Sequence, residues 1–168
     1  MIFHLSAALA KHLKVELTFA KDKIAQPGRV DSWSADLFTS RRHGKFIFVM
    51  HDASMWPILM PLKACRTYEE FLASLLRIIQ QAYLSHGVSF DVANQNIIVT
   101  KRSNRSFIGY MNDAKFHLEV MAGENRNAPP DWPLILSDIA RLPFNAKGVY
   151  FTPATKFSDI VKPPVDSP

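Results

Sequence analysis

The stretch SWSADLFTSRRHGKFIFVMHDASMWPILM, residues 32–60, decides the fold of this chain. Apolar and polar residues alternate in its first segment, SWSADLF, which is typical of a half-buried β-strand. The segment KFIFVMH, residues 45–51, is almost continuously apolar, as a strand in the middle of a sheet is. A polar turn that contains Gly44 separates the two segments, so they are predicted to pair as neighbouring antiparallel strands.

A third strand is predicted where the stretch ends. After a short break at residues 52–54, the segment MWPILM is again apolar. Pro57 has no backbone N–H group to donate to a neighbouring strand, which favours an edge position or an irregular strand. Together, the three segments predict a three-stranded meander.

The clearest helix signal begins at Thr67. Thr67 and Glu70 have the spacing of a capping box, in which each side chain bonds the backbone N–H of the other residue. Apolar residues then recur at helical spacing, and Gly87 is a typical helix stop. These signals predict a helix over residues 68–85.

Weaker patterns complete the expected order of elements. They predict a helix capped by Ser6, helices at 105–122 and 132–141, and short strands at 2–5, 96–100 and 149–151. Hairpin strands followed by helices indicate the α+β class, here a small, mainly antiparallel sheet packed by about three to four helices. The residues expected in its core are Trp33, Phe46, Phe48, Phe71, Leu75, Ile79 and Ile98.

Length and composition indicate one folded unit. The chain has 168 residues, of which 48% are hydrophobic and 21% charged, as in an ordinary globular protein. A single α+β domain is expected over residues 1–152. Residues 153–168 are rich in proline and are expected to form a flexible tail.

Several features favour a cytoplasmic location. Cys65 is the single cysteine, so an internal disulfide bond is impossible, as is common in reducing compartments. The apolar N-terminus lacks a basic leader and is interrupted by His4 and Lys11, which favours a part of the fold over a signal peptide. No apolar run approaches the roughly 20 residues that span a bilayer, so no membrane association is expected.

Two motifs carry a resemblance to a known family. The segments W-x-A-x-L-F and R-S-x-x-G-x-M-N-D are supplied by Trp33, Ala35, Leu37, Phe38, Arg105, Ser106, Gly109, Met111, Asn112 and Asp113. With the apolar strand between them, they resemble a family of small uncharacterised bacterial domains of unknown function. The resemblance covers residues 2–122. It implies the domain itself and supplies no activity, cofactor or catalytic residue.

The second motif is a candidate binding site. Within about two helical turns it offers the cation of Arg105, the hydroxyl of Ser106, the amide of Asn112 and the carboxylate of Asp113. A helix N-terminus beside an arginine suits a phosphate or a carboxylate. His51 follows a buried strand and is expected opposite these residues.

A structural interpretation of the same motif stays open. In it, Asn112 and Asp113 bond neighbouring backbone groups, and Gly109 permits a close helix crossing.

Basic residues form a second candidate site, for polyanions. The net charge is +5 and the isoelectric point is about 9.4, which permits binding to nucleic acid. Arg41, Arg42 and Lys45 lie in the hairpin turn, and Lys101 and Arg102 follow a later strand. If the two groups share an edge of the sheet, they form one cationic patch. The alternative is a pair of solvated turns, and no known nucleic-acid-binding motif decides between them.

Metal and nucleophilic chemistry find less support. The candidate metal ligands lack the spacing of known sites, so no metal and no cofactor is expected. These candidates are His43, His51, Asp52, His117 and Glu119. Cys65 is a candidate nucleophile, with His43 or His51 as its base, but a lone cysteine before a helix is also a common small core residue.

The favoured function is therefore a non-enzymatic binding or regulatory module that acts through a protein or nucleic-acid partner. The alternative is a small enzyme, nuclease-like or another hydrolase, that acts on a phosphate-bearing substrate. Its polar residues would be Arg105, Asn112, Asp113 and His51, provided that they converge in one pocket.

Overall fold

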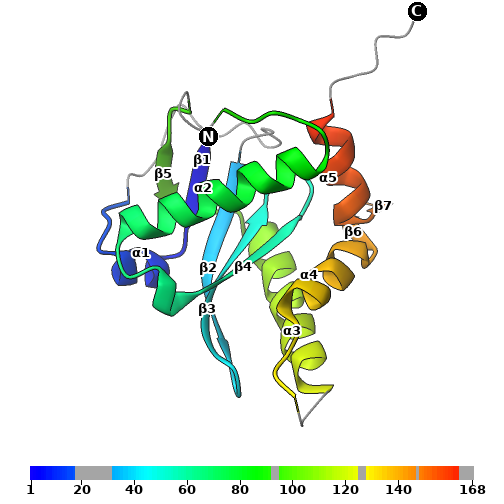
Figure 1. Ribbon diagram of the computed structural model, residues 1–168, viewed down its shortest axis with the longest axis horizontal. Coiled ribbons are helices and arrows are strands. Elements are labelled where there is room, and N and C mark those ends of the chain that lie inside the picture. Colours follow the sequence, from blue (N-terminus) through cyan, green and yellow to red (C-terminus); the bar gives the residue numbers. More distant parts are fainter. Residues whose placement is uncertain (18–31, 92–94, 125–127, 147, 163–168) are drawn as a thin grey trace, which may run out of the picture.

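The protein consists of a twisted β-sheet with helices on both faces (Figure 1). A computed structural model describes residues 1–17, 32–91, 95–124, 128–146 and 148–162. The elements in chain order are β1 (Ile2–Leu5), α1 (Ala7–Leu13), β2 (Ser32–Ser40), β3 (Gly44–His51), β4 (Pro57–Pro61), η1 (Leu62–Ala64), α2 (Tyr68–Ser85), β5 (Ile98–Lys101), α3 (Arg105–Glu124), α4 (Trp132–Arg141), β6 (Phe144–Ala146), β7 (Val149–Phe151) and α5 (Pro153–Val161).

The main sheet has the strand order β4-β3-β2-β1-β5, and β6 and β7 form a separate hairpin. The predicted meander is confirmed, since β2, β3 and β4 pair antiparallel in sequence order. Pro57 begins β4, which is an edge strand as its missing donor requires. In contrast, β1 pairs in parallel with both β2 and β5. The fold is thus α+β with a mixed sheet, in which the antiparallel ladder of β2 and β3 is the longest.

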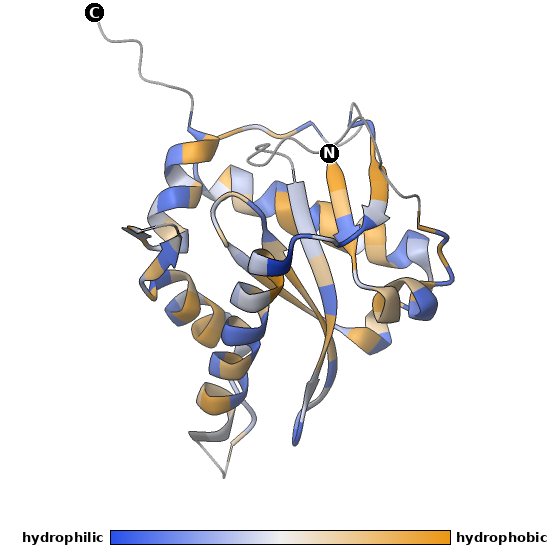
Figure 2. Ribbon diagram, turned by 180° about the vertical axis from the view of Figure 1, so that it is seen from behind, coloured by the Kyte–Doolittle hydropathy of each residue, from blue (hydrophilic) through white to orange (hydrophobic). Residues whose placement is uncertain are grey.

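The core has one part on each face of the sheet. On one face, α1, α2 and α5 cover residues such as Phe3 and Trp33. On the other face, α3 and α4 cover residues such as Phe48 and Met50. Figure 2 shows the second face, where α3 lies in front of the sheet on the side of β2 and β3, away from the edge strand β5. Because β2 is covered on both faces, Ser34 is only 3% exposed, and the expectation of a half-buried strand is wrong for this part of β2.

Local sequence signals place the long helices accurately. Helix α2 begins after the predicted capping box, since the Thr67 Oγ1 accepts from the Glu70 N–H at 3.2 Å and the Glu70 Oε2 accepts from the Thr67 N–H at 3.3 Å. Helix α4 has the predicted bounds, and α3 extends two residues beyond residue 122. Six of the seven expected core residues are buried, and Ile98 is half-buried because β5 is an edge strand.

Part of the expected tail is a helix instead. Residues 153–161 form α5, for which Thr152 is the N-cap. Pro153 stands in the first turn, where a missing N–H costs nothing, so the proline that suggested a tail is compatible with a helix start. Phe157 and Val161 are buried one turn apart and join the core of the α2 face. The rest of the expected tail, residues 163–168, lies outside the described residues.

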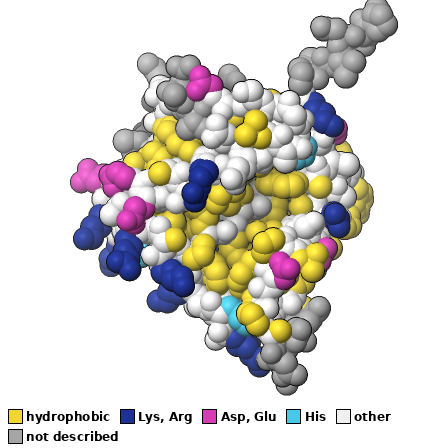
Figure 3. All heavy atoms as spheres, in the orientation of Figure 1, with side chains coloured by type: hydrophobic (Ala, Val, Ile, Leu, Met, Phe, Trp, Pro, Cys, Tyr) yellow, Lys and Arg dark blue, Asp and Glu magenta, His cyan; other side chains and the backbone are white. Residues whose placement is uncertain are grey.

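An apolar groove stays open on the front face of the molecule (Figure 3). It has a volume of about 440 Å³ and lies between α2, the edge strand β4 and α4. In the described ranges, no helix is long and apolar enough to cross a membrane.

Candidate functional site

The Arg105–Asp113 motif forms the first turns of α3 but makes no pocket. Its apolar residues Phe107 and Met111 face the core, and the Asn104 Oδ1 caps the helix by accepting from the Phe107 N–H at 3.1 Å. The four polar residues proposed as a site are all exposed; they are Arg105, Ser106, Asn112 and Asp113. The close helix crossing considered for Gly109 is wrong as well, because a Cβ atom there would meet nothing within 4 Å.

His51 lies on the opposite face of the sheet from α3. Its ring is fully buried, with centroid distances of 4.7 Å to Trp33 and 5.5 Å to Phe157. Its Nδ1 lies 2.7 Å from the Ser54 Oγ, within hydrogen-bond distance. The structure therefore does not bring His51 together with the Arg105–Asp113 motif, and the expected convergence is wrong.

The two basic groups predicted as one patch are also separate. Lys101 pairs with Leu5, which pairs with Ala35 on β2, and Ala35 lies five residues before the end of that strand. Five residues of strand span about 16 Å, so Lys101 is far from the hairpin turn. The side chain of Arg102 is only 10% exposed and points toward β2. The hairpin cations Arg41, Arg42 and Lys45 therefore need other partners if they form a site.

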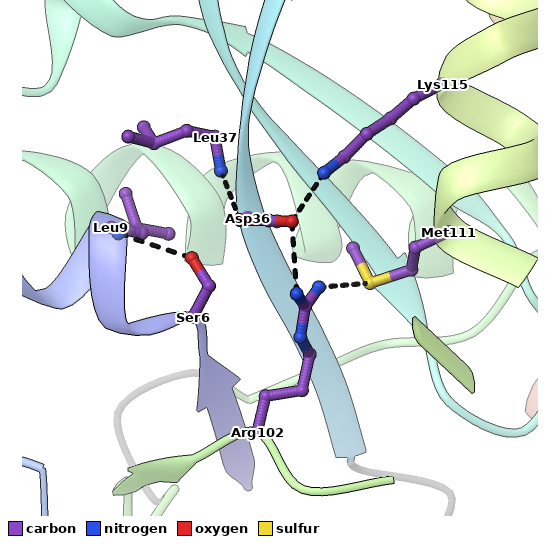
Figure 4. Close-up of polar contacts among 7 residues, drawn as sticks. All are labelled: Ser6, Leu9, Asp36, Leu37, Arg102, Met111 and Lys115. Atoms are coloured by element: carbon purple, nitrogen blue, oxygen red, sulfur yellow. Dashed lines mark hydrogen bonds and ion pairs between the residues drawn. The ribbon is translucent and has the colours of Figure 1, made fainter. Parts of the chain in front are cut away.

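Arg102 instead belongs to a charged network that joins β2, β5 and α3 (Figure 4). The Oδ2 of Asp36 accepts from the Arg102 Nη2 at 3.1 Å and from the Lys115 Nζ at 2.5 Å. The Arg102 Nη1 also contacts the Met111 Sδ at 3.2 Å. Both cations are thereby directed at one carboxylate, which fixes α3 against the sheet.

The electrostatics of this network follow from its burial. Burial raises the pKa of Asp36, but hydrogen bonds from Lys115 and Ser6, together with the charges of Lys115 and Arg102, outweigh burial and leave the pKa below its ordinary value. Burial lowers the pKa of Lys115, and its interaction with Asp36 offsets this only in part. The lowered pKa of Asp36 keeps its carboxylate ionised at neutral pH, where it accepts hydrogen bonds from Arg102 and Lys115.

A hollow beside the turn of the β2–β3 hairpin has a different character. It has a volume of about 530 Å³ and is called the hairpin hollow below. Its lining comes from α1, β3, the segment around η1, and α4, and consists of His12, His43, Gly44, Lys45, Phe46, Pro61, Leu62, Lys63, Arg66 and Trp132. These residues include three permanent cations and two histidines, and no carboxylate is among them. The hairpin hollow is therefore strongly biased toward anions.

Aromatic rings form part of the wall of the hairpin hollow. The indole of Trp132 packs against Phe46 with a centroid distance of 4.8 Å, and against His43 at 6.0 Å, both in edge-on geometry. The ring of His12 is held by the Cys65 carbonyl oxygen, 3.3 Å from its Nε2. Trp132 is half-buried, so part of its ring borders the open space.

A second hollow lies on the other side of the hairpin turn. It has a volume of about 430 Å³ and is lined by Arg41, Arg42, His43, Phe116, Glu119, Val120 and Gly123. His43 lines both hollows. Among the lining residues of the second hollow, Glu119 is the one with a carboxylate. The Glu119 Oε1 accepts from the backbone N–H of Arg41 at 3.0 Å. The hairpin turn therefore has cations on both of its sides.

These observations define one cationic region, the hairpin surface, which consists of Arg41, Arg42, Lys45, Lys63 and Arg66. Among the described residues, none of the five side chains makes an ion pair with a carboxylate. The sequence predicted the first three as part of a polyanion site, whereas Lys63 and Arg66 were not predicted. No pattern in the sequence predicts that Trp132 lies beside the hairpin turn.

The other candidate groups have structural surroundings. Cys65 is buried, and burial followed by the charge of Glu70 raises the pKa of its thiol, which disfavours a nucleophilic thiolate. The Ser32 Oγ donates to the Asp52 Oδ2 at 2.5 Å and lies 3.1 Å from the His4 Nε2. In this cluster the serine proton is directed at the aspartate and not at the histidine, so it lacks the order of a catalytic triad. No three His, Cys, Asp or Glu side chains in the described ranges are grouped to hold a metal ion.

Fold and site together define a small α+β domain whose mixed sheet is covered on both faces and whose β2–β3 hairpin turn carries a cationic surface. The chain belongs to the family described as Domain of unknown function (DUF6933), which matches residues 2–156. The resemblance seen in the sequence is thus confirmed, and the match continues beyond residue 122. Comparisons with curated proteins and with solved structures found no match.

Proposed function

We propose that this domain is a non-enzymatic binding module whose partner is nucleic acid, bound through its phosphates at the hairpin surface. One observation carries the proposal: five lysine and arginine side chains line two hollows, and none of the five forms an ion pair with a carboxylate of the described residues. Cations that are not already neutralised can displace the counterions of a nucleic acid backbone, which provides most of the affinity of such complexes.

Binding through phosphates should weaken as the salt concentration rises. Each phosphate neutralised on a single strand contributes about −0.7 to the slope of log K against log salt, so five contacts give a slope of about −3 to −4. Fluorescence anisotropy of a labelled oligonucleotide between about 50 and 200 mM salt measures this slope directly.

A set of charge variants tests whether nucleic acid binds at the hairpin surface. The triple variant Lys45→Ala, Lys63→Ala, Arg66→Ala should lower affinity at least about tenfold and make the slope shallower by about 2. Arg77→Ala is the matched control, because Arg77 is exposed on α2 and lines neither hollow. Absence of binding at about 50 mM salt, or an equal loss of affinity in the control, would contradict the proposal.

A protein partner has one feature in its favour, the apolar groove between α2, β4 and α4 (Figure 3). Its lining includes Ile58, Ile78 and Leu136. No described segment and no charge pattern indicates what would cover this groove, so nucleic acid is the partner that we prefer.

The enzymatic alternative depended on the convergence of Arg105, Asn112, Asp113 and His51. The first three lie on the exposed side of α3, and His51 is buried on the opposite face of the sheet. The alternative thereby loses its proposed active site, and we favour binding without catalysis.

A further inference from the structure

We infer that the bound nucleic acid is single-stranded, and that one of its bases enters the hairpin hollow and stacks on Trp132. This inference rests on the nucleic-acid binding proposed above and specifies the form of the ligand. Bases are available for stacking on a protein only where they are unpaired, whereas a duplex presents its phosphates and the edges of its bases.

The dimensions and the wall of the hairpin hollow fit a flat ring. Its volume of about 530 Å³ is in the range of sites that enclose small organic ligands. Trp132 is held by Phe46 and His43, so its ring is oriented before any ligand arrives. An ordered aromatic ring that borders a cationic hollow is the combination found in proteins that bind single strands.

Three cations line the same hollow as this ring and could contact the phosphates on either side of a stacked base. Lys45 comes from β3, whereas Lys63 and Arg66 come from the segment around η1. Three cations from two separate segments line the same hollow as Trp132. A base between them would therefore have its flanking phosphates near positive charge.

The second hollow supplies an independent observation for a strand longer than one nucleotide. Phe116 lines it and is 66% exposed, which is unusual for a phenylalanine. Arg41 and Arg42 line the same hollow. Aromatic rings and cations thus occur on both sides of the hairpin turn, with His43 common to the two hollows. A single strand that crosses the turn would have a base near Trp132 and another near Phe116.

The experiment compares three probes with the full chain: a thymidine oligonucleotide, an abasic oligonucleotide of the same length, and a duplex. The thymidine oligonucleotide should bind at least about tenfold more tightly than the abasic one, because base stacking on an aromatic ring contributes to affinity. Trp132→Ala should remove most of this difference, and Phe116→Ala should reduce it. Trp56→Phe is the control, because Trp56 stacks on Phe157 at 5.1 Å and lines neither hollow.

Tryptophan fluorescence gives a readout that does not depend on whether Trp132→Ala folds. In the Trp56→Phe variant the remaining tryptophans are Trp33, which is fully buried, and Trp132. The thymidine oligonucleotide should quench this emission, whereas the abasic one should not. Phe116→Ala changes an exposed side chain and leaves the core intact.

The outcomes separate the two proposals. If neither oligonucleotide binds, nucleic-acid binding itself fails. If both bind equally and without quenching, or if the duplex binds more tightly than the single strand, the hairpin surface is a general polyanion site and the stacking inference is overturned.

Discussion

The substitution Asp36→Asn tests whether the charged network holds α3 against the sheet. It leaves Arg102 and Lys115 without their carboxylate, at side-chain exposures of 10% and 15%. Removing one partner of a fully buried pair costs about 3–5 kcal/mol. Both cations keep some contact with water, so we expect a loss of about 2–3 kcal/mol in the free energy of unfolding.

Urea unfolding followed by circular dichroism measures this loss. Asp113→Asn is the control, since it removes a carboxylate from the exposed side of α3 and should change stability by less than about 0.5 kcal/mol. The double variant Asp36→Asn, Lys115→Met should be more stable than Asp36→Asn alone, because it removes one of the two unpaired cations.

The pH dependence provides a second criterion. The pKa of Asp36 is lowered in the folded state, so its contribution to stability is present above the unfolded pKa, near 4, and is lost as the pH falls through the folded pKa. The stability difference between the wild type and Asp36→Asn should therefore be greatest near neutral pH and shrink in acid. A difference below about 0.5 kcal/mol at pH 7, or one that does not change with pH, would refute the reasoning.

Three further substitutions test the fold and the surface of α3. Phe157→Ala should lower the free energy of unfolding by about 3–5 kcal/mol, because its ring is fully buried among aromatic residues. In urea unfolding, Asp159→Ala should be nearly neutral, because Asp159 is exposed on the same helix. Equal effects of the two substitutions would mean that α5 is not docked on the core. Leu75→Ala should cost about 2–5 kcal/mol in the same assay, and a change below about 0.5 kcal/mol would place Leu75 outside the core. Asn112→Ala should leave the melting temperature unchanged, because Asn112 is exposed and makes no recorded hydrogen bond in the described part of the chain. If this variant loses affinity for nucleic acid, recognition belongs to the exposed side of α3 and not to the hairpin surface.

Features that depend on neighbouring residues were predictable from sequence. The capping box of Thr67 and Glu70, the hairpin turn at Gly44 and the edge position of Pro57 each follow from local backbone chemistry. The parallel pairing of β1 between β2 and β5 was not predictable in this way, because no periodicity records which distant strand a strand will join.

The candidate site shows the same division. Sequence alone determined that Arg41, Arg42 and Lys45 lie in one hairpin turn, since they are neighbours in the chain. Only the tertiary structure decided that Lys63, Arg66 and Trp132 line one hollow with Lys45, and that Arg102 contacts Asp36 instead. Arg102 and Lys115 are 66 and 79 residues from Asp36, and their choice of partner depends on how the chain crosses the sheet. Local patterns determine which elements form, whereas the burial of apolar faces on both sides of the sheet determines which side chains become neighbours.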